Sequence, residues 1–466
     1  MPVLKKTMFR EYDLRGRESD DELNDDSIYH IGRGFGKYLV DRGITECVVG
    51  HDARGTSEGF HKQVIKALTE SGINVHDIGT VTTPLSYWAQ YFLNVKGLVC
   101  ITASHNPVGW NGVKLGDDLS HTLLTKELQD VYETIVKEDY VTAEKPGTVT
   151  KHEVIEPYIK DLLSRAKITK KFKILVNTGN GTAGPIYVKA LKDAGQDIVE
   201  HFTNVDPAYP NYTPNPDGTA MMEDTGKQTV DNHCDFGFAF DGDGDRLGMV
   251  DEKGNTIWPD RYISLLSRLV LSKHPGAKIV FDVKVSEALP EDIAAHGGVP
   301  IMWKTGHSYI KAKLAEEKAA LAGEMSGHIF FVDDFYGFDD GLFAALKFLE
   351  YLSTQNMALS EIIATTPYYV STPTIQVQAG DEKKYDVVNE LTKEFKDEGY
   401  KVIDINGARV YMDGGWGLVR ASSNTPTLVL RFEAKTQEQL DKIMETFHKK
   451  LDRYDFVSKN WDSTGH

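Results

Sequence analysis

Short apolar runs alternate with amphipathic segments along most of this chain. Residues 47–50 and 97–101 are runs of the kind found in buried strands, and residues 58–71 between them carry apolar side chains at helical spacing. The order of strand, loop and helix returns at 174–195 and again at 279–303. Because such alternation is typical of mostly parallel sheets covered by helices, we predict an α/β protein with three units of this kind.

The last hundred residues follow another pattern, with strands and helices grouped together. The segments with strand or helix patterns there are 375–377, 385–396, 402–403, 408–412, 428–432 and 437–451. We therefore predict a separate α+β domain at this end of the chain. Polar stretches at 141–152, near Gly254 and at 366–373 are candidate domain boundaries.

Composition narrows the class of protein. The 466 residues suffice for about three domains with full hydrophobic cores. A formal net charge of −17 argues against binding to nucleic acid or to anionic lipid. Cys47, Cys100 and Cys234 are few and far apart, which favours free thiols in a reducing compartment. Since no apolar leader and no 18-residue apolar stretch occurs, we expect a cytoplasmic protein.

The first loop of chemical interest is 102–107 (TASHNP), directly after the strand at 97–101. A serine at the carboxyl end of a buried strand lies where open α/β sheets bind their ligands. Ser104 lacks the G-x-S-x-G context of a hydrolase, and in an extended chain the neighbouring His105 would point away from it. A turn at Asn-Pro without any chemical role is the alternative.

The second loop is 241–246 (DGDGDR), in which aspartates alternate with glycines. Three carboxylates at this spacing can converge on one hard divalent cation. A calcium EF-hand is the rival, but position six of the loop is Arg246 instead of glycine, and the flanks at 236–240 and 247–250 alternate like strands. Like charges this close disfavour a plain solvated turn. We predict a metal site, with Arg246 beside it for a phosphate oxyanion.

The third loop is 323–328 (GEMSGH), expected between a helix and a strand. In an extended chain Glu324, Ser326 and His328 would fall on one side. A carboxylate, a hydroxyl and an imidazole on one side suit a polyhydroxylated ligand.

The fourth loop is 420–426 (RASSNTP). Arg420 with clustered hydroxyl and amide side chains can wrap a phosphate group. An ordinary hairpin-like turn explains the same residues equally well.

In this order, the four loops resemble the α-D-phosphohexomutase superfamily, and within it the bacterial phosphomannomutase/phosphoglucomutase branch. Residues 9–16 (FREYDLRG) resemble its amino-terminal signature, and 282–284 (DVK) and 303–308 (WKTGHS) resemble stretches of its third domain. The resemblance spans nearly the whole chain. It departs at the phosphate loop, where relatives usually have R-A-S-N-T-x-P and this chain has Ser423 and Asn424 in place of Asn and Thr.

The resemblance implies four domains around a central active-site cleft. Three would be related α/β units with mixed, mostly parallel sheets, and the fourth a smaller α+β domain. With the candidate boundaries above, the predicted domains are 1–152 with the phosphoserine, 153–253 with the metal site, 254–367 for sugar recognition and 368–466 for phosphate binding.

The resemblance also implies roles for single residues. Ser104 would carry the phosphoryl group, and Mg²⁺ would be bound by this group with Asp241, Asp243 and Asp245. The other catalytic candidates are His105, Lys114, Arg246 and Arg15, and the general acid/base stays open among His105, Lys114, Arg15 and His328. The residues implied to contact the substrate are Tyr12, Lys284, His307, Glu324, Ser326, His328, Arg420, Ser422, Ser423, Asn424 and Thr425.

The implied reaction is reversible phosphoryl transfer between the 1- and 6-positions of mannose, of glucose, or of both. It would pass through a hexose 1,6-bisphosphate, with glucose 1,6-bisphosphate or mannose 1,6-bisphosphate as activator. Phosphosugars are the predicted partners, and the sequence does not separate monomer from dimer. One alternative is phosphoglucosamine mutase, whose relatives usually carry Gln where this chain has Met325. The other is a non-catalytic sugar-phosphate or Ca²⁺-binding protein on the same scaffold.

Overall fold

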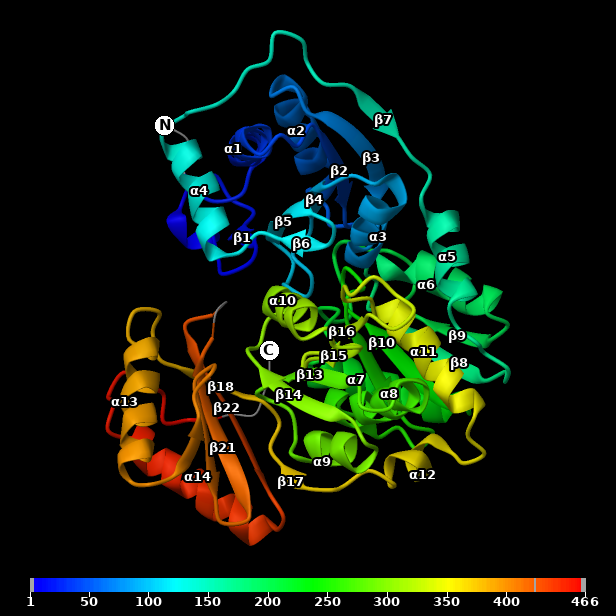
Figure 1. The fold of residues 1–466 in the computed structure, drawn as a ribbon, viewed down its shortest axis with the longest axis vertical. Coiled ribbons are helices and arrows are strands. Elements are labelled where there is room, and N and C mark those ends of the chain that lie inside the picture. Colours follow the sequence, from blue (N-terminus) through cyan, green and yellow to red (C-terminus); the bar gives the residue numbers. More distant parts are fainter. Residues whose placement is uncertain (1–3, 423–424, 462–466) are drawn as a thin grey trace. The chain divides into compact units, whose positions relative to one another are not determined.

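The computed structural model describes residues 4–422 and 425–461 (Figure 1). Contacts divide the chain into two compact units. The first holds the residues up to Pro216 with Ala220–Ile257 and Gly327–Leu359. The second holds Asp217–Thr219, Trp258–Ser326 and the residues from Ser360 onward.

The first sheet of the first unit is mixed. Its strand order is β1-β5-β4-β2-β3-β7, with β6 paired to β5. Strands β4, β2, β3 and β7 run parallel, while β1 and β5 are antiparallel to their neighbours. The strands are β1 (Leu14–Arg17), β2 (Glu46–His51), β3 (Asn74–Thr80), β4 (Gly97–Ile101), β5 (Trp110–Asp118), β6 (His121–Thr122) and β7 (Val149–Lys151).

Helices pack on this sheet with the apolar faces that the sequence pattern predicts. Helices α1 and α2 lie side by side (Figure 1), and α3 packs against β2 and β4. The shared core includes Phe35 and Ile31 of α1, Phe60 and Val64 of α2, and Val49 of β2. The helices are α1 (Asp25–Asp41), α2 (Ser57–Glu70), α3 (Thr83–Leu93) and α4 (Thr125–Val136), and a short 3₁₀ turn, η1 (Lys6–Met8), precedes them.

The second sheet of this unit has the order β12-β11-β10-β8-β9. Strands β10, β8 and β9 are parallel, and β11 and β12 continue the sheet in antiparallel fashion. Its strands are β8 (Lys173–Asn177), β9 (Asp197–His201), β10 (Phe236–Phe240), β11 (Leu247–Val250) and β12 (Thr256–Ile257), accompanied by α5 (Ile155–Ser164), α6 (Ala183–Asp193) and α7 (Thr219–Asp231). Strand β16 (Ile329–Phe331) and helix α11 (Gly341–Ser353) also belong to the first unit.

The second unit begins with three parallel strands in the order β14-β13-β15. These are β13 (Lys278–Asp282), β14 (Val299–Trp303) and β15 (Leu321–Gly323), with helices α8 (Pro259–Lys273), α9 (Ala288–Ala295) and α10 (His307–Glu317). The third polar loop was expected between a helix and a strand. This is wrong, because β15 precedes it and residues 325–327 form a turn, so the chain is not extended there.

The last part of the second unit is a sheet with the order β17-β22-β21-β20-β19, to which β18 adds on β22. Helices α13 and α14 pack on one face of it (Figure 1). The elements are α12 (Leu359–Ile363), β17 (Val370–Ser371), β18 (Ile375–Gln378), α13 (Lys384–Asp397), β19 (Lys401–Ile403), β20 (Ala408–Met412), β21 (Gly415–Ala421), β22 (Thr427–Ala434) and α14 (Gln437–Leu451).

The predicted fold class is confirmed: three α/β parts with mixed, mostly parallel sheets precede an α+β part. Strand β21 was not predicted, and Arg420 lies in it instead of in a loop. The bounds of the four predicted domains stay predictions. All three cysteines are free and buried, as expected. Among the described residues, no helix combines the length and the apolar character needed to cross a membrane.

Candidate active site

Two loops of the first unit meet at the carboxyl ends of their strands. The loop after β4 brings Ser104, and the loop after β10 brings Asp241. The Ser104 Oγ donates a hydrogen bond to Asp241 Oδ2 over 2.7 Å, although the two residues are 137 positions apart in the chain. Both side chains are almost completely buried. The serine therefore faces the aspartate cluster, at the sheet edge where ligands of α/β proteins bind.

The backbone at Ser104 is left-handed, with φ at +49°. This conformation costs a non-glycine residue roughly 1–2 kcal/mol. It turns the Ser104 Oγ toward the next side chain, so that it lies 3.1 Å from His105 Nδ1. The expectation that His105 points away from Ser104 is therefore wrong, because it assumed an extended chain.

Asp241, Asp243 and Asp245 converge as predicted, with one oxygen of each within 4.8 Å of the others. All three are fully buried. Asp243 Oδ1 and Asp245 Oδ1 accept no hydrogen bond. Buried carboxylate oxygens without donors are costly unless a cation joins them. The set of hard oxygen ligands fits a divalent cation, so the residues present agree with a metal site.

Glycines allow the aspartate loop to fold this tightly. A Cβ on Gly242 would come within 2.5 Å of the Ser104 carbonyl oxygen, and one on Gly244 within 2.5 Å of the Tyr187 hydroxyl. Gly244 also has φ at +78°, which favours glycine. The remaining oxygen of Asp243 accepts from the hydroxyls of Thr83 at 2.6 Å and Thr102 at 3.0 Å.

Lys114 is the cation closest to the cluster, with Nζ 2.7 Å from Asp245 Oδ2 and 3.5 Å from Asp243 Oδ2. Burial alone would lower the pKa of Lys114, but these two carboxylates outweigh it and raise the pKa well above its ordinary value. Burial and the neighbouring Asp245 and Asp243 raise the pKa of Asp241 well above its ordinary value. The cluster thus holds more negative charge than its surroundings neutralise, which favours an added cation.

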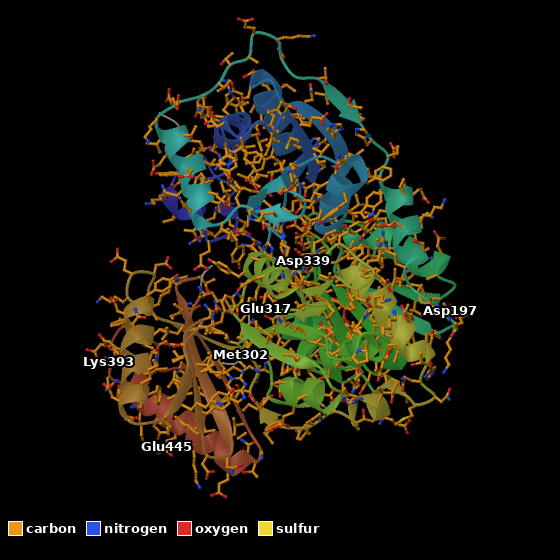
Figure 2. The ribbon with its side chains drawn as sticks, in the orientation of Figure 1. Asp197, Met302, Glu317, Asp339, Lys393 and Glu445 are labelled. Atoms are coloured by element: carbon orange, nitrogen blue, oxygen red, sulfur yellow. The ribbon has the colours of Figure 1, made fainter. Side chains whose placement is uncertain are left out.

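Arg246 and His328 form a pair beside the aspartates. Arg246 Nε donates to His328 Nε2 over 3.0 Å, and His328 Nδ1 lies 2.9 Å from Asp339 Oδ2. Asp339, labelled in Figure 2, is completely buried. An Nε2 that accepts requires the proton on Nδ1, next to the Asp339 carboxylate. The Nε of Arg246 lies 3.8 Å from Asp241 Oδ2, the oxygen that accepts from Ser104.

Arg15 approaches the serine loop from β1. Its Nη1 donates to the Ala103 carbonyl oxygen at 2.7 Å and to Asn106 Oδ1 at 2.5 Å, while Nε pairs with Asp13 at 2.8 Å. Burial, followed by Arg246 and Arg15, lowers the pKa of His105 well below its ordinary value, so this imidazole is neutral near pH 7. Tyr12 precedes β1 and is partly exposed.

The remaining predicted residues belong to the second unit, where the ends of β13, β14 and β15 come together. Glu324 Oε1 accepts from the Gly306 N–H at 2.5 Å, at the start of α10. Asp282 accepts from the Met325 N–H at 3.2 Å and lies 3.6 Å from Lys284 Nζ. The buried His307 is the first residue of α10, and Ser326 is partly exposed in the turn after Glu324.

The phosphate-loop residues follow β21. Arg420 lies on the opposite face of this strand from Val419 and Ala421, which pack under the helices. Its face also carries Trp416 and Leu418, which contact Val283 next to Lys284. Thr425 donates through its N–H and its hydroxyl to the Ser422 Oγ, at 3.2 and 2.8 Å. The predicted Ser423 and Asn424 lie outside the described residues.

No site role was predicted from the sequence for three residues that contact these sites. Arg54 follows β2 and donates to backbone oxygens of the serine loop, Asp339 lies beside His328, and Asp282 ends β13. A signal existed for Arg54 and Asp282, because each comes directly after or at the end of a buried strand next to a predicted site strand. Asp339 follows no such strand and had no signal of this kind.

Comparison with known proteins matches four segments to the domains of one family. Residues 6–142, 156–254 and 258–369 match phosphoglucomutase/phosphomannomutase alpha/beta/alpha domains I, II and III, and residues 375–450 match its C-terminal domain. The four matches follow the family order of domains along the chain. They cover most of its length.

Relatives match the whole chain. It is 40% identical over 453 residues to a phosphomannomutase/phosphoglucomutase of Pseudomonas syringae pv. tomato, covering 97% of this chain and 96% of the relative. It is 38% identical to a phosphoglucomutase of Neisseria gonorrhoeae, covering 96% and 97%. The crystal structure of a phosphoglucomutase/phosphomannomutase family protein from Burkholderia thailandensis superposes with a TM-score of 0.90 at 36% identity, covering 97% and 98%. The chain belongs to the phosphoglucomutase/phosphomannomutase family.

Proposed function

We propose that this chain interconverts hexose 1-phosphate and hexose 6-phosphate through a phosphoserine formed at Ser104. Family membership makes it an enzyme, an isomerase that moves a phosphoryl group within a phosphosugar. The observation that carries the residue assignment is the hydrogen bond from the Ser104 Oγ to Asp241, inside a buried cluster of three carboxylates. A hydroxyl at such a cluster is placed to receive and to release a phosphoryl group.

The reaction consists of two transfers. In the first, an oxygen of the hexose monophosphate bonds to the phosphoserine phosphorus as the bond from Ser104 Oγ to phosphorus breaks, and the attacking hydroxyl gives its proton to a base. This yields a hexose 1,6-bisphosphate and free Ser104. In the second, Ser104 Oγ bonds to the other phosphorus and gives up its proton, and the sugar oxygen that leaves takes a proton. The enzyme returns to its phosphorylated form, and added glucose 1,6-bisphosphate would activate enzyme that has lost the phosphoryl group.

Asp241, Asp243 and Asp245 would hold Mg²⁺ together with the phosphoserine. When bound, Mg²⁺ supplies positive charge to the phosphoryl oxygens during transfer. Arg246, whose Nε lies 3.8 Å from Asp241 Oδ2, would donate to the same phosphoryl oxygens, and its hydrogen bond to His328 fixes the direction of its guanidinium group. The Nδ1 of His105 lies 3.1 Å from Ser104 Oγ, and its imidazole is neutral near pH 7, which supports His105 as the group that exchanges a proton at this oxygen. Lys114, Arg15 and His328 remain the other candidates for this acid/base role.

The second unit would bind the sugar and its resting phosphate. Glu324 and Ser326, with His307 and Lys284, offer acceptors and donors for hydroxyl groups. Arg420, Ser422 and Thr425 offer charge-assisted and hydroxyl donors for a phosphate. This set contributes mainly positioning, because it must accept either end of the sugar. Tyr12, Ser423 and Asn424 stay predictions for the same contacts.

Mannose and glucose are the proposed sugars. Met325, where glucosamine-specific relatives usually carry Gln, supports this choice over phosphoglucosamine mutase. A non-catalytic sugar-phosphate or Ca²⁺-binding protein is disfavoured, because binding alone does not require a serine hydroxyl and an arginine beside the aspartate cluster. We also propose a cytoplasmic location, which the free thiols support.

Substrate profiling tests the proposal. Purified protein with Mg²⁺ and glucose 1,6-bisphosphate is given the 1-phosphates of mannose, glucose and glucosamine in turn. We expect turnover of the first two and at least about tenfold lower kcat/KM for the third. A preference for glucosamine 1-phosphate would replace the proposed substrates, and binding without turnover of any of the three would replace the proposed function.

A further inference from the structure

One buried arginine donates hydrogen bonds to several backbone carbonyl oxygens in and next to the serine loop, the loop at 102–107 that follows β4. Arg54 Nη2 donates to the carbonyl oxygens of Ser104 at 2.8 Å and Asn106 at 2.7 Å. Its Nη1 donates to those of Pro107 and Trp110, each at 3.2 Å. Four carbonyl groups, three in the loop after β4 and one at the first residue of β5, thus accept from a single guanidinium group.

Arg54 in turn contacts an aspartate and a tyrosine. Its Nε lies 3.2 Å from Asp52 Oδ2, and its guanidinium group lies over the ring of Tyr209 at 5.3 Å from the ring centre. Asp52 Oδ1 in turn accepts from the Arg54 N–H at 3.0 Å and from the Ser57 hydroxyl at 2.5 Å. Because Arg54 is only 5% exposed, water cannot replace these bonds without opening the loop.

The serine loop needs such support. Ser104 adopts a left-handed conformation that costs a non-glycine residue free energy, and such conformations persist only where the surroundings impose them. The Ser104 carbonyl oxygen also passes within 2.5 Å of where a Cβ on Gly242 would lie, so the loop has little room to shift. Arg15 holds the loop at the Ala103 carbonyl oxygen on the other side of Ser104.

We propose that Arg54 is a positioning residue for phosphoryl transfer, holding Ser104 in the backbone conformation that directs its Oγ at Asp241. The inference rests on the proposed function. Arg54 contacts the loop backbone, and no contact with the substrate is assigned to it. Its contribution depends on the planar fork of five N–H groups, which a lysine ammonium cannot reproduce at four acceptors.

Arg54→Lys separates geometry from charge, since it keeps the positive charge and loses the fork. We expect kcat with glucose 1-phosphate, Mg²⁺ and saturating glucose 1,6-bisphosphate to fall about 100-fold, the usual effect of misplacing a reacting group by an ångström. The KM for glucose 1-phosphate should change little, because the sugar contacts are intact. Unchanged kcat in Arg54→Lys would overturn the proposal.

Arg33→Lys is the matched control. Arg33 is also buried in the first unit, pairs with Glu70 at 3.0 Å and donates to the Val141 carbonyl oxygen at 2.8 Å, but it does not contact the serine loop. We expect a similar fall in melting temperature in both variants and a fall in kcat only in Arg54→Lys. An equal fall in kcat in both variants would mean a general structural effect and would also overturn the proposal.

Asp52→Asn keeps the inference testable if Arg54→Lys does not fold. The amide retains the acceptor at Oδ1 and removes the ion pair that orients Arg54. A reduced kcat with unchanged KM supports the proposal, whereas wild-type kcat contradicts it. The wild-type protein is assayed in parallel. If it turns over no hexose 1-phosphate, the proposed function fails. If it is active and Arg54→Lys and Asp52→Asn have the same kcat as the wild type, only the inference about Arg54 fails.

Discussion

Lys114 and Asp245 form a fully buried ion pair in the aspartate cluster, with 2.7 Å between Nζ and Oδ2. Asp243 lies 3.5 Å from the same ammonium group. One lysine thus offsets part of the charge of three carboxylates. Without a metal ion, the stability of the folded protein depends on this lysine, and a bound divalent cation should reduce that dependence.

Lys114→Met tests this relationship. Removing one partner of a buried ion pair costs about 3–5 kcal/mol. We expect a loss of this size in the free energy of unfolding with EDTA, and a smaller loss with Mg²⁺, measured by denaturant melts in both conditions. Lys347→Met is the control, because Lys347 forms a buried pair with Glu350 far from the aspartates in the chain. Equal losses in both conditions for Lys114→Met would contradict the role of Lys114.

Asp243→Asn tests the metal assignment. The amide keeps the size of the side chain but removes one of three negative ligands. We expect kcat to fall about 100-fold or more and the Mg²⁺ concentration for half-maximal activity to rise. Asp251→Asn is the control, since Asp251 is also buried but caps the turn at 251–255 outside the cluster. An unchanged Mg²⁺ titration in Asp243→Asn would argue against the predicted metal site.

Arg420→Gln tests the phosphate role of β21. Hydrogen bonds to charged groups contribute about 1.5–3 kcal/mol, so the KM for glucose 1-phosphate should rise about 10- to 100-fold. Steady-state kinetics give this value directly. Because Arg420 is assigned to the phosphate that is not transferred, a variant with wild-type KM would remove it from the substrate site.

Asp340 gives a prediction about pH. Burial raises its pKa to about 7, even though it accepts from the Phe343 N–H and the Tyr158 hydroxyl at 2.8 Å each. The folded protein therefore keeps a proton that the unfolded chain releases near pH 4, so the stability from Asp340 is full below about pH 4 and is lost as pH rises toward 7, at up to about 1.4 kcal/mol per pH unit.

Asp340→Asn should remove this dependence, because the amide does not titrate. Denaturant melts between pH 4.5 and pH 7.5, about the window set by the two pKa values, measure it. We expect the difference in unfolding free energy between variant and wild type to move in favour of the variant as pH rises. A difference that stays constant over this range would show that Asp340 does not retain its proton.

Several elements of the fold follow from apolar periodicity. The buried runs at β2, β4, β8 and β13 and the amphipathic helix α14 were predictable because their patterns are strong. Other elements were not predicted, including strands β3, β5 and β9. Strands β15 and β21 were missed as well. Both contain glycine and neither alternates clearly, so only their hydrogen bonds to neighbouring strands identify them.

The aspartate cluster was predictable because its ligands lie within five residues of each other. The contact between Ser104 and His105 was not predictable. It depends on the left-handed backbone of Ser104, and a serine, unlike a glycine, gives no sign of this conformation in the sequence. Arg54 donates to the Ser104 carbonyl oxygen across 50 positions of the chain, a contact that depends on the order of strands in the sheet, which sequence periodicity does not encode. Asp339 lies only 11 positions after His328, but no periodic pattern marks it as a partner of the imidazole.

Phosphoryl occupancy of Ser104, measured by intact mass together with turnover, is the test of the proposed phosphoserine mechanism. We predict that the purified wild type carries one phosphoryl group on Ser104 and is active, and that Ser104→Ala carries none and stays inactive with added glucose 1,6-bisphosphate and Mg²⁺. Ser120→Ala, which changes another left-handed serine of the first sheet region, should keep both properties. Full mutase activity in Ser104→Ala would contradict the phosphoserine mechanism.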